Sequence, residues 1–313
     1  MTQSVESPTY SPPGRRRSRW RPGYWQRDAL EGVAFVSPQL LGFLLFVVGP
    51  VLAIAWFALH DWNVIAGTFD FVGTANFEAM LHDKALPTVV LASVLFALGY
   101  VPLNVSLGLL AALAVSKAAH AAGAMRTVYF VPVVVSGVAW ALVWRFMLQD
   151  EGAVNGFLSV FGIEGPNWLR DSGWAIGMVV VVQVLKDIGF SMVIFLAALQ
   201  GIPSDLEEAA RIDGANNRNV FWHVTLPLLT PFVFLMIVLS IISSIKSFAL
   251  IFLLTRGGPG YDTTTIPFYI YQRAFQNFDM GYASSLAVVL FFVVMILTAG
   301  QFALRKRWVF YEE

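Results

Sequence analysis

Residues 174–200 read WAIGMVVVVQVLKDIGFSMVIFLAALQ, a run in which only Lys186 and Asp187 carry charge. As an α-helix this run would rise about 40 Å, which exceeds the roughly 30 Å thickness of a bilayer's hydrocarbon core. A helix of a small soluble domain does not need so long an apolar stretch. The run therefore predicts a transmembrane helix.

Five further stretches are comparably long and apolar. Together with residues 174–200 they give six predicted spans, which in chain order are Val33–Leu59, Leu86–Val115, Thr127–Leu148, Trp174–Gln200, Leu228–Leu254 and Tyr282–Leu304. None shows sustained alternation of apolar and polar residues in stretches of about ten, which is the pattern of a membrane β-barrel strand. The sequence therefore predicts an all-α integral membrane protein with six transmembrane helices in a lipid bilayer.

The composition supports a membrane protein and excludes several other classes. Hydrophobic residues make up 57 % of the 313 residues and charged residues 13 %, against about 45–50 % and about 25 % in soluble domains. Twenty basic and twenty acidic residues cancel, so the overall charge indicates no nucleic-acid partner. The absence of cysteine excludes disulfides, thiolate metal sites and cysteine nucleophiles.

Basic residues beside the spans predict the orientation. They precede span 1, separate spans 2 and 3 and spans 4 and 5, and follow span 6, at Arg15, Arg16, Arg17, Arg19, Arg21, Arg27, Lys117, Arg126, Arg211, Arg218, Arg305, Lys306 and Arg307. Because such residues favour the cytoplasmic side, both termini and the loop 201–226 are predicted to be cytoplasmic. Residues 1–30 lack apolar periodicity and are expected to be a disordered basic cytoplasmic tail before a membrane domain at 31–313.

The loop between spans 4 and 5 contains helix signals. Ser204 and Glu207 have the spacing of a capping box at a helix start, and Asp213-Gly214 is a typical helix stop. Leu206, Ala209 and Ala210 would form a small apolar face. Such a face suits close docking of another surface, but an ordinary solvated helix has the same pattern, and the residues alone do not decide between them.

A resemblance favours docking. Glu208-Ala209-Ala210, then Gly214 after three residues, then Val224-Thr225-Leu226-Pro227 after nine more, resembles the EAA loop of binding-protein-dependent ABC importer permeases. That family has isoleucine where this chain has Val224. The flanking segments resemble the sugar branch of the family, which includes maltose-type and glycerol-phosphate-type permeases. They are Ile202-Pro203, Ile212-Asp213-Gly214-Ala215, Thr255-Arg256-Gly257-Gly258-Pro259 and Gly281-Tyr282-Ala283.

The resemblance implies a function and a set of partners. It implies a bacterial or archaeal cell-membrane permease subunit that imports a carbohydrate. The short cytoplasmic helix between helices 4 and 5 would be the coupling helix, which contacts a separate ATPase. The expected partners are a second permease subunit, an ATPase dimer that binds the ATP and magnesium, and an extracytoplasmic solute-binding protein. The candidate ATPase-coupling residues are Glu207, Glu208, Ala209, Ala210, Asp213 and Gly214.

Polar residues inside the spans are candidates for solute binding, because they are rare in lipid. Helical spacing places two polar stripes on spans 4 and 5, and Trp140 of span 3 could stack on a sugar ring. The candidate substrate-binding residues are Gln183, Asp187, Ser240, Ser244 and Ser247. Serines can instead join helices to one another. Lys246 could pair with Asp187 or indicate an anionic solute.

The sequence contains no sign of catalysis or of a resident cofactor. Neither paired intramembrane carboxylates nor a metal-binding His motif is present, and the four histidines are isolated from one another. The glycine-rich run 257–260 lacks the Lys-Ser/Thr of a phosphate-binding loop. We therefore expect a transporter subunit rather than an enzyme, without cofactor or metal. The alternative cargo is a non-sugar or phosphorylated solute such as a glycerophosphodiester.

Overall fold

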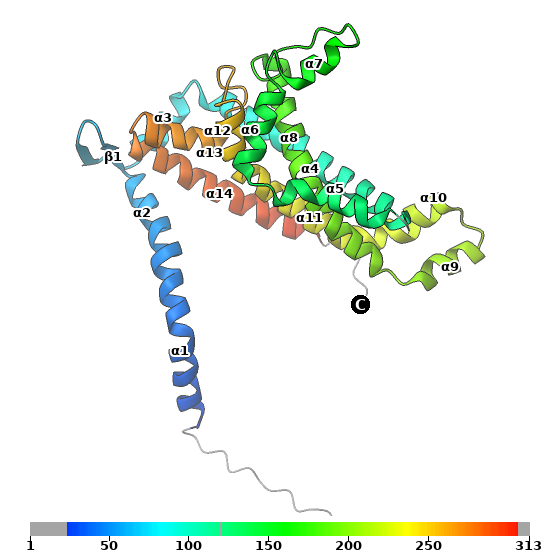
Figure 1. The fold of residues 1–313 in the computed structure, drawn as a ribbon. Helices are drawn as coiled ribbons and strands as arrows, with labels where there is room; N and C mark the ends of the chain where they lie inside the picture. Colours follow the sequence, from blue (N-terminus) through cyan, green and yellow to red (C-terminus); the bar gives the residue numbers. More distant parts are fainter. Residues whose placement is uncertain (1–23, 119–120, 306–313) are drawn as a thin grey trace, which may run out of the picture. The chain divides into compact units, whose positions relative to one another are not determined.

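The computed structural model describes residues 24–118 and 121–305, and most of them are helical (Figure 1). The chain separates into two units, Met1–Ala53 and Ile54–Glu313, which are described individually. The first unit contains α1 (Tyr24–Phe43) and the π-helical turn η1 (Leu44–Val48), and α2 (Gly49–Phe57) continues into the second unit. Helix α1 begins seven residues before the expected domain start at residue 31. The rest of the predicted tail, 1–23, lies outside the described residues.

The second unit is built from four long helices and many short elements. The long helices are α4 (Leu86–Lys117), α8 (Ser172–Gln200), α11 (Leu226–Lys246) and α14 (Met280–Arg305). The short helices are α3 (Ala75–His82), α5 (Ala122–Val134), α6 (Gly137–Met147), α7 (Ala153–Ser159), α9 (Ser204–Ile212), α10 (Asn217–Val220), η2 (Phe221–Thr225), α12 (Ala249–Leu254), α13 (Ile266–Tyr271) and η3 (Gln272–Gln276).

Five of the six predicted spans contain a long helix, and the other one is bent. The predicted span Leu228–Leu254 is helical only to Lys246, because the helix breaks there and α12 follows as a separate element. Among the described residues, five helices are long and apolar enough to cross a membrane, at Glu31–Phe57, Leu86–Lys117, Ser172–Gln200, Asn217–Lys246 and Met280–Arg305. The third predicted span, Thr127–Leu148, is not one straight helix, because α5 and α6 meet at a bend of 99°. Pro132 lies in the last turn of α5 and cannot donate a backbone hydrogen bond, which favours a break there.

A small β-hairpin corrects the all-α expectation. Strands β1 (His60–Asn63) and β2 (Thr68–Phe71) pair antiparallel, with His60 opposite Phe71 and Asn63 opposite Thr68. The Asn63 side chain accepts hydrogen bonds from the backbone of Ile65 and Ala66, which forms the turn. Aromatic residues suit strands, and His60 stacks on Phe69 at 4.5 Å between ring centroids.

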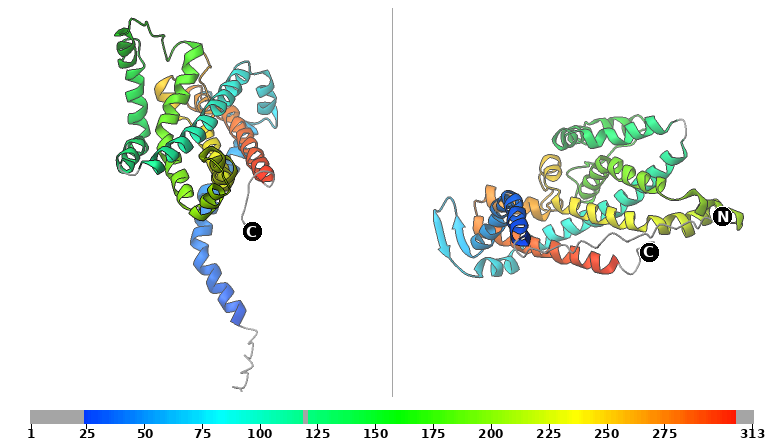
Figure 2. Two further views of the ribbon diagram at one scale, coloured as in Figure 1. Left: turned by 90° about the vertical axis from the view of Figure 1, so that its right-hand side faces the viewer. Right: turned by 90° about the horizontal axis from the view of Figure 1, so that it is seen from below.

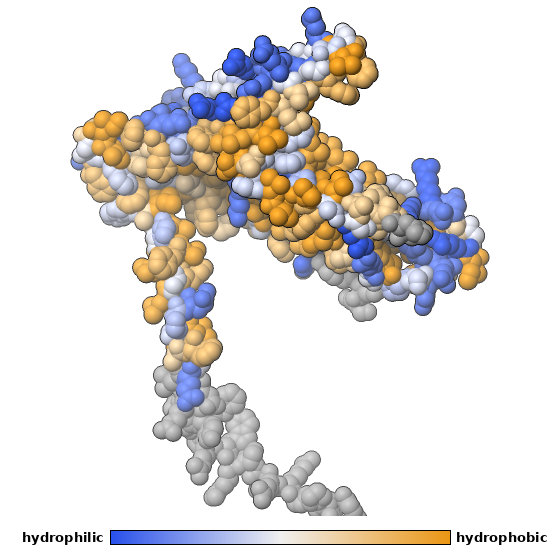
Figure 3. Space-filling view, viewed as in Figure 1, coloured by the Kyte–Doolittle hydropathy of each residue, from blue (hydrophilic) through white to orange (hydrophobic). Residues whose placement is uncertain are grey.

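Helices α4, α8 and α11 lie side by side and form the centre of the second unit (Figures 1 and 2). Gly108 of α4 faces Ser191 of α8 so closely that a Cβ at Gly108 would collide with the serine. Small residues allow such close approach of membrane helices. On the face shown in Figure 3, hydrophilic residues gather over α9 and α10 at one end and near α7 at the other, with hydrophobic residues between them.

Candidate functional site

A carboxylate on α8 is held by two side chains in the centre of the bundle. Asp187 Oδ2 accepts a hydrogen bond from Gln183 Nε2 at 2.6 Å and one from the Tyr100 hydroxyl of α4 at 2.6 Å. Tyr100 is buried, whereas Gln183 and Asp187 are half-buried. The structure thus brings together Gln183 and Asp187, which the sequence predicted to share one face of span 4.

One turn further along α8, a second polar group joins three helices. Ser191 donates to Asn104 Oδ1 at 3.1 Å, and Asn104 Nδ2 donates to Ser240 Oγ of α11 at 2.9 Å. All three side chains are no more than 2 % exposed. The hydroxyl of Ser240, a predicted solute contact, therefore takes part in helix–helix packing.

Ser244 and Ser247, the other predicted serines, lie apart from this group. Ser244 donates to the backbone oxygen of Ile241 at 2.8 Å, within its own helix. Ser247 lies at the break between α11 and α12, and its buried hydroxyl has no hydrogen-bond partner among the described residues. Lys246 is exposed and, in the part of the chain that the structure describes, forms no ion pair with Asp187.

The second intramembrane lysine stabilises the break in the third span. Lys186 Nζ donates to the backbone oxygens of Val135 at 2.8 Å and Pro132 at 3.2 Å. The last carbonyls of α5 have no partner within that helix, and a positive charge there also suits the helix dipole. Trp140 of α6 donates to the Val182 carbonyl at 3.0 Å and so holds α6 against α8.

Sequence reasoning missed Tyr100 and Asn104. Both lie in the apolar run of span 2, four residues apart and hence on one face of the helix. An amide inside a predicted membrane helix is the signal that could have identified Asn104. The two hydrogen bonds by which Lys186 caps the C-terminal end of α5 could not be identified in this way, because the acceptors are backbone oxygens of another span.

The helix predicted between spans 4 and 5 is present as α9. The expected capping box is wrong, because Pro203 precedes the first turn and no side chain caps it. Glu207 instead accepts a hydrogen bond from Thr225 Oγ1 of η2 at 3.2 Å and pairs with Arg211 at 3.6 Å. The hydrogen bond from Thr225 holds the Glu207 carboxylate away from the start of α9. It also connects α9 to the segment that leads into α11.

The predicted stop at Asp213-Gly214 is confirmed. Gly214 has φ +89°, its N–H bonds to the Arg211 carbonyl at 3.0 Å, and the Ala215 N–H bonds to the Ala210 carbonyl at 3.0 Å. This pair of bonds ends a helix sharply, and its left-handed residue is usually glycine.

The outer surface of α9 is open in the described chain. Glu208, Ala209, Asp213 and Gly214 are exposed, and Ala210 is half-buried. Leu206 and Ile212 are 40 % and 86 % exposed, so this surface is partly apolar. A cavity of about 370 Å³ behind the helix, lined by Lys117, Gln200 and Glu207 among others, separates α9 from the ends of α4 and α8.

At the opposite end of the bundle, a carboxylate joins the start of α4 to α13, η3 and α14. Asp83 Oδ2 accepts hydrogen bonds from Tyr269 at 2.5 Å, Tyr282 at 2.6 Å and Arg273 at 2.9 Å. Burial opposes its ionisation, but the hydrogen bonds from Tyr269 and Tyr282 and the charge of Arg273 outweigh it and lower the pKa of Asp83 to about 2. The ionised side chain therefore stabilises this end of the fold.

Residues 24–118 and 121–305 contain no group of three His, Asp or Glu side chains that could hold a metal ion. Several polar groups of the bundle satisfy one another across helices, and α9 presents an accessible surface at one end. This arrangement can position a solute or a partner protein.

Comparison with known proteins identifies the family. Residues 84–309 match the family described as "Binding-protein-dependent transport system inner membrane component". The probable ABC transporter permease protein YesP of Bacillus subtilis is 34 % identical over 92 % of this chain and 94 % of its own length. The sulfoquinovosyl glycerol transport system permease protein SmoG of Agrobacterium fabrum is 32 % identical over 90 % of this chain and 92 % of its own.

The fold has a counterpart among solved structures. A chain of a bacterial alginate ABC transporter, solved in complex with an alginate pentasaccharide-bound periplasmic protein, superposes with a TM-score of 0.80 at 21 % identity. The match covers 91 % of this chain and 98 % of that chain. The present chain is therefore a multi-pass ABC transporter permease and belongs to the family of inner membrane components of binding-protein-dependent transport systems.

Proposed function

We propose that this chain is the membrane subunit of an ATP-driven importer for a sugar or sugar derivative, and that α9 is its coupling helix. The observation that carries the proposal is the construction of α9. The helix ends sharply at Gly214, is tied to η2 by the Glu207–Thr225 hydrogen bond, and exposes its remaining surface. A short helix connected in this way passes a push at its surface into α8 and α11 as a rigid body.

The candidate coupling residues divide into two roles. Glu208, Ala209, Asp213 and Gly214 are exposed and would contact the ATPase, with half-buried Ala210 at the edge of the contact. The small side chains permit close approach, and the exposed Ile212 adds apolar area. Glu207 turns toward its own chain and would set the position of α9 on η2.

The orientation follows from the basic residues near the spans. Arg211 and Arg218 lie in the loop that carries α9, and Lys117 and Arg126 flank the connection from α4 to α5. Because positive residues favour the cytoplasmic side, we infer that both loops, and with them both termini, are cytoplasmic. The end of the bundle that contains Asp83 then faces outward.

The full transporter would contain this chain, a second permease subunit, two ATPase subunits and an external solute-binding protein. ATP and magnesium would bind to the ATPases, and the chain itself would need no cofactor. Closure of the ATPases would shift α9 and open the bundle toward the binding protein, and ATP hydrolysis would reset it. Such alternating states require a two-state packing of the helices.

A carbohydrate cargo is supported by a curated relative and by the chemistry of the bundle. SmoG, at 32 % identity, is named for a sugar derivative. Gln183 and Asp187 are half-buried and offer the amide and carboxylate oxygens that bind sugar hydroxyls. We propose this pair as the main solute contact, with Ser244 and Ser247 as further candidates, and Ser240 as a residue that positions α11.

The coupling role is tested with Glu208→Lys and Gly214→Asp in the complete transporter. We expect normal amounts in the membrane, loss of ATPase co-purification and loss of ATP-driven uptake of radiolabelled sugars. Charge reversal at Glu78, which is exposed on α3 at the other end of the unit, is the matched control and should leave uptake unchanged. Unimpaired uptake in both α9 variants at normal membrane levels would refute the assignment.

A further inference from the structure

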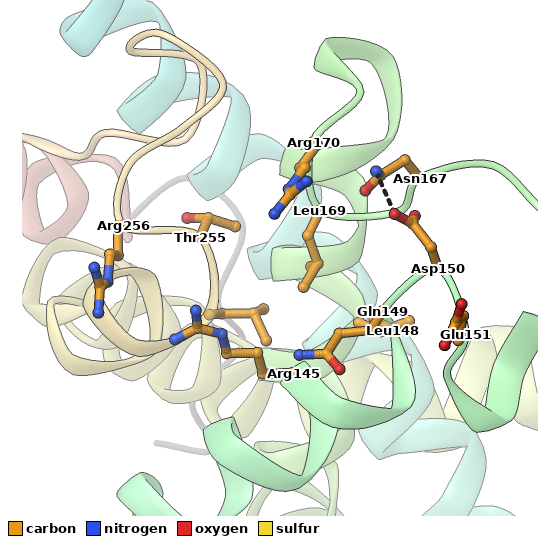
Figure 4. A pocket seen from close by; sticks show the side chains of 11 residues that line it. Arg145, Leu148, Gln149, Asp150, Glu151, Asn167, Leu169, Arg170, Thr255 and Arg256 are labelled. Carbon is orange, nitrogen blue, oxygen red and sulfur yellow. Dashed lines mark hydrogen bonds between the residues drawn. The ribbon is translucent and has the colours of Figure 1, made fainter.

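A polar pocket of about 500 Å³ lies at the end of α8 opposite to α9 (Figure 4). It is formed where α6, the segment before α8, and the end of α12 meet. Its floor includes Leu148 and Leu254, which are 0 % and 3 % exposed. Pockets of this volume are in the range that encloses small ligands.

Three arginines from three different segments line this pocket. Arg145 comes from α6, Arg170 from the segment before α8, and Arg256 from the turn after α12. The ion pairs formed within the described residues involve Arg211 and Arg273, so none of the three pocket arginines is neutralised by a carboxylate of the described chain. Their mutual repulsion would be relieved by a bound anion.

The backbone fixes the position of Arg256 at the end of α12, where its N–H donates to the Ile251 carbonyl at 2.9 Å. Arg256 has φ +54°, in the left-handed region that glycine adopts without strain, and Gly257 follows it. Arg145 is also fixed in place, because it donates a hydrogen bond to the Leu253 carbonyl at 3.2 Å.

The opposite side of the pocket presents acceptors. Figure 4 shows Asp150 and Glu151 across the pocket from Arg145 and Arg256, and Asn167 donates to Asp150 at 3.0 Å. Carboxylate oxygens accept hydrogen bonds from hydroxyl groups, whereas guanidinium groups bind carboxylates and phosphates through two parallel bonds. A ligand that fits both sides carries hydroxyl groups and an anionic group.

We propose that this arginine pocket (Arg145, Arg170 and Arg256) is an external loading site for a sugar that carries an anionic group. The site rests on the proposed function for its orientation and for the sugar class. The arginines bind the acidic substituent, and Asp150 and Glu151 bind the hydroxyl groups. The solute thus pauses at the outer mouth before it enters the bundle.

The test uses the full chain in phosphatidylcholine nanodiscs and saturation-transfer NMR, which detects weak binding. The probes are D-glucuronate, its neutral methyl ester and D-glucose. We expect glucuronate to bind at least about tenfold more tightly than either neutral probe, as loss of a charge-assisted contact implies. Arg170→Gln combined with Arg256→Gln should weaken glucuronate binding by about tenfold or more. This variant leaves Arg145 and its contact with α12 intact.

Arg126→Gln is the matched control, because Arg126 is exposed on α5, does not line the pocket and should leave glucuronate binding unchanged. Equal binding of the three probes, or glucuronate binding that survives the double substitution, would overturn the proposal. So would displacement of glucuronate when phosphatidylglycerol is added to the nanodiscs, because the pocket would then take a lipid headgroup.

A parallel measurement separates this proposal from the proposed function. If the complete transporter imports neutral sugars with ATP but shows no arginine-dependent glucuronate binding, the loading site is refuted. The assignment as a sugar importer is then supported. If no sugar is imported in any form while arginine-dependent binding persists, the assignment as a sugar importer falls instead.

Discussion

The bend between α5 and α6 should depend on one lysine. Lys186 donates to the carbonyls of Val135 at 2.8 Å and Pro132 at 3.2 Å, and Lys186→Met removes both bonds at similar side-chain length. Hydrogen bonds from charged groups contribute about 1.5–3 kcal/mol each. Because removing the ammonium also removes its own desolvation penalty, we expect a net loss of about 2–3 kcal/mol in the free energy of unfolding.

The loss can be measured by thermal unfolding in nanodiscs, followed by the fluorescence of the ten tryptophans. A domain of this size loses about 2–4 °C in Tm per kcal/mol, so Lys186→Met should unfold about 4–12 °C below the wild type. Lys246→Met is the matched control, since Lys246 is also near the membrane but exposed. It should shift Tm by less than about 2 °C.

A second measurement reads the bend itself. The chain has no cysteine, so spin labels can be attached at Ala124→Cys on α5 and Phe146→Cys on α6, which are both exposed. Lys186→Met should broaden or shift the distance distribution between the labels. An unchanged Tm together with an unchanged distance distribution would refute the claim that Lys186 stabilises the bend. An equal loss of Tm in Lys246→Met would refute it as well.

Two further predictions concern the ends and the centre of the bundle. A double-mutant cycle of Asn104→Leu and Ser240→Ala should give a coupling of about 0.6–1.7 kcal/mol in unfolding free energy, and a coupling near zero would contradict the hydrogen bond. The lowered pKa of Asp83, from 3.8 to about 2, means that its contribution of about 2 kcal/mol is present above pH 4 and is lost as the pH falls through 2. Unfolding curves measured from pH 5 to pH 2 should show this slope in the wild type and not in Asp83→Asn; parallel curves would exclude it.

Local sequence signals were sufficient to predict features that depend on one segment alone. The apolar run of span 4 was placed within two residues of α8, because burial of about twenty consecutive apolar residues in lipid needs no partner. Gly214 ended α9 as expected, since its left-handed conformation is a property of the residue itself. The location of Gln183 and Asp187 on one face of the helix also followed from helical spacing alone.

Features that depend on a partner from a distant segment could not be predicted from local sequence. The capping box at Ser204 failed because Glu207 found the Thr225 hydroxyl of another segment. Span 3 was predicted as one span, and its bend depends on α5 and α6, with Lys186 placed against the carbonyls of α5. For Ser240 the sequence left open whether the hydroxyl contacts solute or joins helices, and in the folded chain it accepts a hydrogen bond from Asn104.

The sequence by itself determined that this chain is a helical membrane protein, where most of its long apolar helices lie, and, through the pattern around Glu208, which family it resembles. These properties depend on hydropathy and local backbone preference, which act over one or two turns of chain. The tertiary structure decided which polar groups satisfy one another across helices and which remain open. That division depends on how closely α4, α8 and α11 approach, as at Gly108, and no single segment encodes that distance.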